Sequence, residues 1–496
     1  MQYAIGIDIG TGSTKAVALS ASGKPLASVQ TQYQNTDSEK DITEQNPETI
    51  WEAFKQCLSQ TIDKIKEPPA IICLSSYMHG IMAVDQNGAP LTKLITWADT
   101  RADDIAAELR QSPEAALLYR TTGTPLHSMS PLCKLIWWKR NQPELIHRAA
   151  KFISIKEYIW YKLFHEYQVD HSIASATGLM DIKKLSWSGQ SLNLCGIEPS
   201  QLSTLVENSY TRNDPDSQIV NQFNIPPGTK FCIGASDGCL ANLGSGAIKK
   251  NIAALTIGTS GAVRTVSPEP VYNDAAMIFN YILDKELYVC GGPVNNGGNT
   301  IQWLLSKFLN KPLDDKAYQN LFDIADRIEA GSKNLIFLPY LYGERAPIWD
   351  EKACGTYFGI REYHQAEHFI RAGIEGVCFA LNKVLETLEQ TAGPVTQLNI
   401  SGGLLHSMVW MQILADITGK NLFMSQTEDA SALGAAIMGL KSAELITSYE
   451  ILEKTEGKLI VPDKDNHQRY QNLFGIFKNL YRVLQQAMDR VYELNH

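Results

Sequence analysis

Two short loops rich in glycine, threonine and serine constrain this chain more than any other feature. DIGTGSTK begins at position 8 after the apolar run YAIGI, and TIGTSG begins at position 256 after IAAL, so half of the 496 residues separate them. Glycine lets the backbone approach a bulky ligand, and hydroxyls with exposed N–H groups suit an anion. The repetition predicts a duplicated, two-lobed architecture with a phosphate site in each half.

The first loop matches neither common nucleotide motif. Thr14 precedes Lys15, so the G-x-x-x-x-G-K-[ST] spacing is absent, and the third glycine of the dinucleotide fingerprint is missing. A tight hairpin turn is the alternative interpretation of either loop taken alone. Other parts of the chain must decide between the two.

A third glycine-rich element favours the nucleotide interpretation. The strand-like LNIS runs into Gly402 and Gly403, and an apolar run with helical spacing begins at Met408. A strand, two glycines and a helix N-terminus are typical of an anion site beside a nucleoside. The segment NNGGNTIQWLL, which begins at Asn295, repeats the glycine pair. In both segments the glycines could instead serve close packing of a strand and a helix.

Composition limits the class of protein. The chain is too long for a single core, so we expect at least two domains. A net charge of −9 without a Lys/Arg block disfavours nucleic acid as a partner. No window of 18 uninterrupted apolar residues predicts a membrane span, and nine cysteines without a C-x-x-C pair favour a reducing compartment. We expect a cytoplasmic protein with a small-molecule substrate; a homodimer is compatible with the sequence but not indicated by it.

The loops together resemble those of the FGGY-family carbohydrate kinases. DIGTGSTK is similar to that family's first phosphate motif, TIGTSG to its second and SGGLLHSMVWMQ to its adenosine motif. ITWADTRA, GASDGCLANLG and PYLYGERAPIW together resemble the family's gluconate kinases. One position departs from that pattern, because Gly80 creates an MHG triplet like that of xylulokinases where the gluconate kinases carry serine.

The resemblance implies a two-domain α/β fold of the actin/hexokinase/Hsp70-like (ribonuclease H-like) ATPase class. Each domain is expected to hold a mixed five-stranded sheet with flanking helices, and the two to close over a cleft. The expected N-terminal domain covers 1–246 and carries the sugar site and first phosphate loop. The expected C-terminal domain covers 247–445 and carries the second phosphate loop and adenosine site. A helical tail at 446–496 is expected to pack on the body.

The resemblance also implies ATP and Mg²⁺ as cofactors and assigns site residues by position. Asp237 in GASDG is the expected general base, and Asp8 is expected to orient Mg²⁺ through water. The expected ATP-binding residues are Thr11, Gly12, Ser13, Lys15, Gly258, Thr259, Gly298, Gln302, Gly402, Gly403 and Ser407. The expected sugar-binding residues are His79, Trp97, Arg101 and Asp237 itself, although core filling is an equal interpretation for Trp97.

The expected reaction is transfer of the γ-phosphoryl group of ATP to the terminal hydroxyl of D-gluconate, giving 6-phospho-D-gluconate. An aldonate carries a carboxylate, for which His79, Arg101, Lys134 and Arg264 are candidate partners. A xylulokinase or another pentulose or polyol kinase is the alternative within the family. Outside it, GASDG also satisfies the G-x-S-x-G pattern of serine hydrolases with Ser236 as nucleophile, and a non-catalytic member of the same fold is a third possibility.

Overall fold

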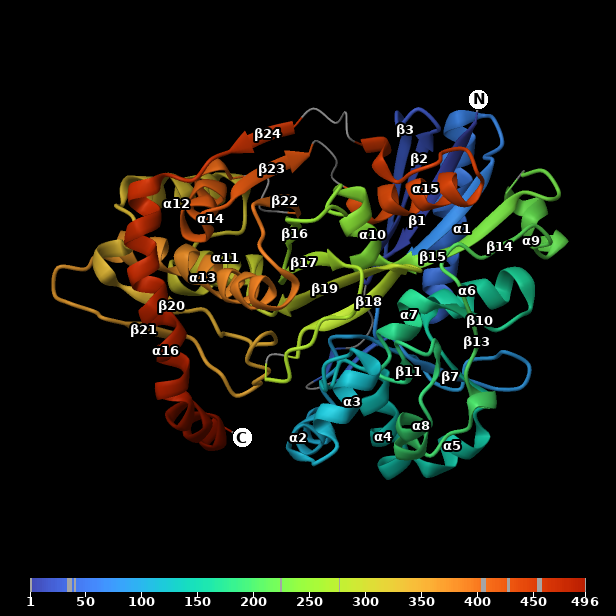
Figure 1. Ribbon diagram of the computed structural model, residues 1–496, viewed down its shortest axis with the longest axis horizontal. Coiled ribbons are helices and arrows are strands. Elements are labelled where there is room, and N and C mark those ends of the chain that lie inside the picture. The colour runs from blue at the N-terminus through green and yellow to red at the C-terminus, as the bar shows by residue number, and fades with distance from the viewer. Residues whose placement is uncertain are drawn as a thin grey trace. The chain divides into compact units, whose positions relative to one another are not determined.

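The computed structural model describes residues 2–33, 38–39, 42–223, 225–275, 277–402, 407–425, 429–452 and 457–495. The chain forms two compact units (Figure 1). The first comprises Met1–Gly246, Ser267–Val289 and Asp429–Lys454, and the second Ala247–Val266, Cys290–Glu428 and Thr455–His496. The chain therefore enters the first unit three times. The predicted domain boundaries at 246 and 445 stay predictions.

The first unit is built on a mixed sheet. Its strand order is β14-β15-β6-β1-β2-β3, in which β1, β2 and β3 form antiparallel hairpins while β6 and β15 run parallel to β1. Five of these strands form the predicted five-stranded sheet, and the two-residue β14 extends it at one edge. The strands are β1 (Tyr3–Ile9), β2 (Ser13–Ser20), β3 (Pro25–Gln32), β6 (Ile71–Ser76), β14 (Thr211–Arg212) and β15 (Lys230–Ser236).

The other elements of this unit surround the sheet or extend from it. The helices are α1 (Pro47–Ile65), α2 (Asp103–Gln111), α3 (Ala115–Thr122), α4 (Pro131–Asn141), α5 (Pro143–Arg148), α6 (Ile155–Phe164), α7 (His171–Ser175), α8 (Gly189–Cys195), η1 (Pro199–Gln201), α9 (Ser217–Val220), η2 (Asn221–Phe223), α10 (Asp237–Gly244), α15 (Ala430–Ser442) and η6 (Glu450–Leu452). The short strands are β4 (Ser38–Glu39), β5 (Ile42–Gln45), β7 (Met82–Val84), β8 (Leu94–Ile95), β9 (Lys151–Ile153), β10 (Gln168–Asp170), β11 (Met180–Asp181), β12 (Ser186–Trp187), β13 (Thr204–Val206) and β18 (Phe279–Asp284).

Glycines bring α10, α15 and β1 into backbone contact. A Cβ on Gly6 would lie 2.0 Å from the carbonyl oxygen of Ala432, and one on Gly434 would lie 2.0 Å from that of Leu240. No larger residue fits at such distances without moving the backbone. Through α15, this packing connects α10, whose first residue is Asp237, to the strand that carries Asp8.

The second unit repeats the mixed-sheet plan. The strands follow the order β19-β17-β16-β22-β23-β24, with β16, β22 and β23 parallel, and β17 and β24 antiparallel to their neighbours β16 and β23. The strands are β16 (Ile252–Ile257), β17 (Gly261–Ser267), β19 (Leu287–Val294), β20 (Ile336–Leu338), β21 (Thr356–Phe358), β22 (Gln397–Gly402), β23 (Asn421–Ser425) and β24 (Gly457–Ile460). The helices are α11 (Gly298–Trp303), η3 (Leu304–Phe308), α12 (Asp315–Arg327), η4 (Ser332–Asn334), α13 (Ala366–Ala392), α14 (Met408–Thr418) and α16 (Lys464–Asn495).

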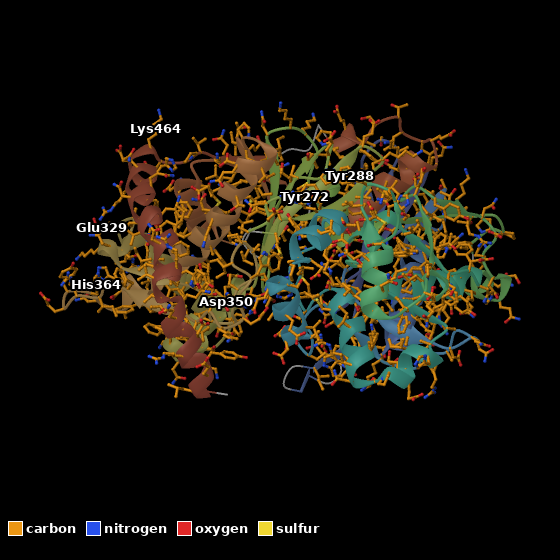
Figure 2. All side chains as sticks on the ribbon, turned by 60° about the horizontal axis from the view of Figure 1, so that its bottom comes forward. Tyr272, Tyr288, Glu329, Asp350, His364 and Lys464 are labelled. Carbon is orange, nitrogen blue, oxygen red and sulfur yellow. The ribbon has the colours of Figure 1, made fainter. Side chains whose placement is uncertain are left out.

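The C-terminal helix α16 belongs to the second unit and begins at Lys464, which Figure 2 labels. Its buried Tyr470 joins a polar network on α13, where the Tyr470 hydroxyl donates to Glu375 at 2.7 Å. Val491, near the C-terminal end of the helix, is 48% exposed. Among the described helices, none is both long and apolar enough to cross a membrane.

Candidate active site

The predicted first phosphate loop is the tip of the β1–β2 hairpin. The Gly10 N–H donates to the Ser13 carbonyl at 3.0 Å, which closes the turn. The side chain of Gln45 donates to the Thr11 carbonyl at 2.6 Å, and the backbone N–H of Tyr33 donates to the Gly12 carbonyl at 3.1 Å. A Cβ on Gly12 would meet no atom within 4 Å. The carbonyls of the loop therefore accept hydrogen bonds from the rest of the protein, and the space at Gly12 stays open. A phosphate-binding turn requires such open space.

Two carboxylates lie near each other in the first unit. Asp8 is near the end of β1, and Asp237 begins α10 directly after β15. Burial and the neighbouring Asp237 carboxylate raise the pKa of Asp8 to about 7, although a hydrogen bond from Ser75 at 2.6 Å opposes the shift. The N–H of Gly238 donates to Asp237 at 2.6 Å. Two neighbouring negative charges repel each other, so a cation bound between these acids would stabilise their ionised forms.

These two carboxylates suit Mg²⁺ that keeps some of its water ligands better than they suit a metal ion held entirely by protein side chains. No cluster of three or more His, Cys, Asp or Glu side chains that could hold a metal occurs in the described parts of the chain. Mg²⁺ usually keeps several waters and binds one or two carboxylates together with substrate phosphates. Asp8, beside the first phosphate loop, fits that chemistry.

Lys15 has a partner that sequence reasoning missed. Its ammonium lies 2.6 Å from the carboxylate of Asp429, the residue before α15. In the β1–β2 register Lys15 lies directly opposite Asp8, and its charge lowers the pKa of that acid. The predicted ATP-binding lysine is thus already part of an ion pair in the first unit.

The predicted sugar-site residues occupy different environments. His79 has a φ of 68°, and its ring contacts the Ala176 carbonyl through Nδ1 and the Tyr281 hydroxyl through Nε2. The guanidinium of Arg101 donates to Asp99 at 2.8 Å and to Glu44 at 2.6 Å, and these contacts raise its pKa. Trp97 is partly buried against the core of the first unit. Arg101 therefore has its charge balanced by the protein.

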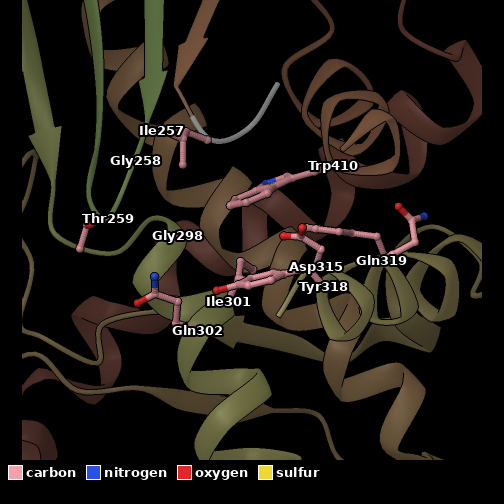
Figure 3. A pocket seen from close by; sticks show the side chains of 11 residues that line it. Ile257, Gly258, Thr259, Gly298, Ile301, Gln302, Asp315, Tyr318, Gln319 and Trp410 are labelled. Atoms are coloured by element: carbon pink, nitrogen blue, oxygen red, sulfur yellow. The ribbon is translucent and has the colours of Figure 1, made fainter. Parts of the chain in front are cut away.

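A cavity of about 590 Å³ lies within the second unit. Its lining joins the predicted residues Gly258, Thr259, Gly298 and Gln302 to a set that sequence reasoning missed. In Figure 3 the predicted residues lie at one end, and Trp410 and Gln319 lie at the other. The remaining lining residues are Ile257, Ile301, Asp315, Tyr318 and Phe322. A concave site with aromatic walls and a few polar groups is typical of small-molecule binding.

Glycines shape the end of this cavity that the predicted second phosphate loop forms. The Gly298 N–H donates to the Gly258 carbonyl at 2.8 Å, and a Cβ on Gly298 would lie 2.6 Å from that oxygen. A Cβ on Gly258 itself would meet nothing within 4 Å, so space stays open over the loop. Gly402 has a φ of 90°, and a Cβ there would lie 2.4 Å from the Ile257 carbonyl. Phosphates and an adenosine would fit these residues.

Ser407, a further predicted ATP-binding residue, lies at the start of α14. Ser407 is the N-cap of α14 and accepts a hydrogen bond from the Trp410 N–H at 3.2 Å, so it fixes the helix that presents a pocket residue. Gly403 lies outside the described residues. The structure therefore brings Gly258, Thr259, Gly298 and Gln302 together at one cavity and gives Ser407 a capping contact.

Ser236 does not have the environment of a hydrolase nucleophile. Its side chain is buried and caps α10 by accepting from the Cys239 N–H at 3.4 Å. Its hydroxyl also contacts that of Ser172 at 2.9 Å, and no histidine is among its hydrogen-bond partners in the described chain. A serine nucleophile needs an adjacent base, so the G-x-S-x-G pattern here is a helix cap.

Comparison with known proteins decides the family. Residues 3–244 match the N-terminal domain of the FGGY family of carbohydrate kinases, and residues 253–443 match its C-terminal domain. The chain belongs to the FGGY family of carbohydrate kinases. A gluconokinase of Bacillus subtilis is 39% identical over 99% of this chain and 97% of its own, and a xylulose kinase of Lactococcus lactis is 28% identical over 100% and 99%.

Solved structures of this family of kinases confirm the predicted fold. A gluconate kinase from Lactobacillus acidophilus has a TM-score of 0.93 at 33% identity and covers 99% of both chains. A ligand-bound xylulose kinase from the same organism has a TM-score of 0.94 at 33% identity, covering 99% of this chain and all of its own. The predicted resemblance and the two-domain actin/hexokinase-like architecture are therefore confirmed. The roles of individual site residues stay predictions.

Proposed function

We propose that this chain is a gluconokinase, which transfers the γ-phosphoryl group of Mg·ATP to the terminal hydroxyl of D-gluconate. The observation that carries the proposal is the identity of 39% to a gluconokinase over nearly the whole of both chains, against 28% to a xylulose kinase of similar coverage. The two Lactobacillus structures do not separate the substrates, because each is 33% identical to this chain.

In the proposed reaction Asp237 accepts the proton of the sugar hydroxyl. Its position at the first turn of α10 stabilises the ionised carboxylate, and the Gly238 N–H holds one carboxylate oxygen. A carboxylate fixed in this way can act as a general base without moving during the reaction. Bound Mg²⁺ would neutralise charge on the phosphates. Asp8 would hold it through water, beside the turn that Thr11, Gly12 and Ser13 form.

The proposed nucleotide site uses the cavity of the second unit. Gly258 and Thr259 would donate to phosphates, and Gly298, Gln302, Gly402, Gly403 and Ser407 would bind or position the nucleoside. Support comes from the cavity volume of about 590 Å³ and from Trp410, whose ring offers a surface for a base. Lys15 would contribute a cation near the phosphates.

The charges of the sugar site do not explain the choice of an aldonate. Arg101 already pairs with two acids, and the buried ammonium of Lys134 donates to two backbone carbonyls. The proposal of gluconate therefore rests on the relatives. Gly80 favours xylulose as the second candidate, because it creates the triplet that resembles xylulokinases.

Three further proposals accompany this function. We propose the cytoplasm as the location, supported by nine cysteines that are all free thiols. The N- and C-terminal domains at 1–246 and 247–445, with a tail at 446–496, are proposed as functional divisions. A homodimer stays a prediction that size-exclusion chromatography with light scattering would test.

A coupled assay tests the proposed function. Purified protein with Mg·ATP is supplied with gluconate, xylulose, ribulose and glycerol in turn, and ADP release and product mass are followed. Gluconate is expected to give the highest kcat/KM and 6-phosphogluconate as product. A higher kcat/KM with xylulose would overturn the gluconate assignment while leaving the kinase assignment in place.

A further inference from the structure

The segment GER at 343–345 has no role in the proposed reaction, yet all three of its residues are buried. Glu344 is 1% exposed. Carboxylates are almost never buried to this extent unless other groups pair with them. Backbone hydrogen bonds in both directions, at 2.9 and 2.8 Å, join Glu344 to Asp350, which Figure 2 labels. These bonds fix the backbone from which the buried carboxylate extends.

The carboxylate of Glu344 accepts hydrogen bonds from the turn that precedes α11. One oxygen accepts from the backbone N–H of Asn295 at 2.5 Å and from that of Arg345 at 2.8 Å, and the other accepts from the side-chain amide of Asn296 at 3.1 Å. All three groups donate, which suits an ionised carboxylate. Burial raises the pKa of Glu344 to about 7, and these hydrogen bonds oppose the shift. The turn therefore stabilises the charge that burial disfavours.

The two asparagines of the turn also bind the segment that carries Glu344. Nδ2 of Asn295 donates to the Tyr342 carbonyl at 2.9 Å, and Nδ2 of Asn296 donates to the Gly343 carbonyl at 2.8 Å. A carbonyl oxygen can only accept, so the atom of Asn296 that faces Gly343 is the amide nitrogen. Asn296 is fully buried. Backbone and side-chain contacts together thus fix the turn on this segment.

The same turn is bonded directly to the predicted second phosphate loop. The N–H of Gly298 donates to the Gly258 carbonyl at 2.8 Å, and the N–H of Asn299 donates to the Thr259 carbonyl at 3.1 Å. The side chain of Asn299 also donates to the Asn295 carbonyl at 3.0 Å. Hydrogen bonds therefore connect the buried carboxylate, through the turn, to the loop at one end of the cavity in Figure 3.

We infer that Glu344 is a positioning residue of the nucleotide site, which acts through Asn295 and Asn296 to hold the Gly298 turn against the predicted second phosphate loop. Glu344 is not among the described residues that line the cavity. Groups that bind a ligand keep their geometry when neighbouring hydrogen bonds fix them. The inference rests on the proposed function for the presence of a nucleotide in this cavity, and on the structure for the hydrogen bonds.

Glu344→Gln tests the inference at about pH 8, above the pKa of about 7 of the wild-type carboxylate. The amide keeps one oxygen for the two backbone N–H groups but places a second donor 3.1 Å from the amide nitrogen of Asn296. Burial penalises the charge, which the amide lacks, so the variant should fold. Isothermal titration calorimetry with a non-hydrolysable ATP analogue and Mg²⁺ should give a Kd about 10-fold above that of wild type, the effect of losing one hydrogen bond to a charged group. The KM for the sugar should stay within about 2-fold.

Glu375→Gln is the matched control. Glu375 is also 1% exposed in the second unit, and it accepts from the Gly331 N–H and from the Ser332 hydroxyl, each at 2.9 Å. Neither of these partners is among the described residues that line the cavity. Glu375 also pairs with Arg371 at 2.9 Å, so Glu375→Gln should lose more stability than Glu344→Gln. It should nevertheless bind the analogue within about 2-fold of wild type.

Asn296→Ala removes the same hydrogen bond from the other side, so the test does not depend on one variant. The double variant with Glu344→Gln should bind the analogue within about 2-fold of the weaker-binding single variant, because both changes break one shared contact. Hydrogen exchange gives a readout without nucleotide. The amides of Gly298 and Asn299 should exchange about 10-fold faster in both single variants and at the wild-type rate in Glu375→Gln.

Several results would overturn the inference while the proposed function stands. They are a wild-type Kd in Glu344→Gln, additive effects in the double variant, wild-type exchange at Gly298 and Asn299, and an equal loss of affinity in Glu375→Gln. If wild type itself does not bind the analogue, the proposed function is wrong and the inference is wrong with it.

Discussion

Substitution of Gly298 by alanine should weaken ATP binding without unfolding the protein. The new Cβ would lie 2.6 Å from the Gly258 carbonyl oxygen, and real Cβ atoms essentially never come closer than 3.0 Å. The contact must therefore open by at least 0.4 Å, which moves the second phosphate loop relative to α11. A hydrogen bond to a charged phosphate contributes about 1.5–3 kcal/mol, so losing one should raise the Kd for ATP about 10- to 150-fold.

Isothermal titration calorimetry with a non-hydrolysable ATP analogue and Mg²⁺ measures this effect directly. Gly475→Ala is the matched control, because a Cβ there meets nothing within 4 Å and the residue lies on the exposed side of α16. That control should bind the analogue like wild type and gain up to about 1 kcal/mol of stability, since alanine favours helix over glycine. A folded Gly298→Ala protein with a Kd within about twofold of wild type would refute the proposed placement of the nucleotide in this cavity.

Three further substitutions, one of them with a matched control, test other residues. Asp237→Asn should lower kcat by about 10²- to 10⁴-fold while ATP binding persists, and near-normal turnover would remove this residue from the mechanism. Burial raises the pKa of Glu157 to about 7, so the folded state binds a proton more tightly than the unfolded state and the free energy of unfolding falls as pH rises from about 4.5 to 7. Glu157→Gln should therefore be more stable than wild type at pH 8, on the order of 1–3 kcal/mol, and similar to it at pH 4.5; equal urea denaturation curves at pH 8 would contradict this. Arg101→Lys removes the paired hydrogen bonds that the guanidinium donates to the buried Asp99, and it should raise the KM for the sugar. The control is Arg140→Lys, at an ion pair in which both side chains are more than half exposed. It should change neither the KM nor the melting temperature.

Features encoded by neighbouring residues could be predicted from the sequence. The β1–β2 turn follows from the glycines between two apolar runs, and the two-domain fold with mixed sheets follows from the resemblance that those loops carry. The contact of Arg101 with Asp99 also had a local signal, because the acid lies only two residues earlier. The capping role of Ser407 could have been recognised from its place before a helical run.

Contacts between distant segments could not be predicted from local patterns. Asp429 meets Lys15 from 414 residues away, and Tyr281 meets His79 from 202 residues away. Neither residue lies in a loop with the composition of a binding site, so nothing marks it before folding brings it to its partner. The aromatic wall of the proposed nucleotide cavity has the same origin, since Trp410 lies in an apolar helix and has the pattern of an ordinary core residue.

A competition experiment tests the central claim, that this kinase acts on gluconate. Equal concentrations of gluconate and xylulose are incubated with limiting Mg·ATP, and both phosphorylated products are quantified by mass spectrometry, so their ratio reports the ratio of kcat/KM values. The account predicts that 6-phosphogluconate exceeds phosphorylated xylulose by about tenfold or more. A mixture in which phosphorylated xylulose predominates would contradict it.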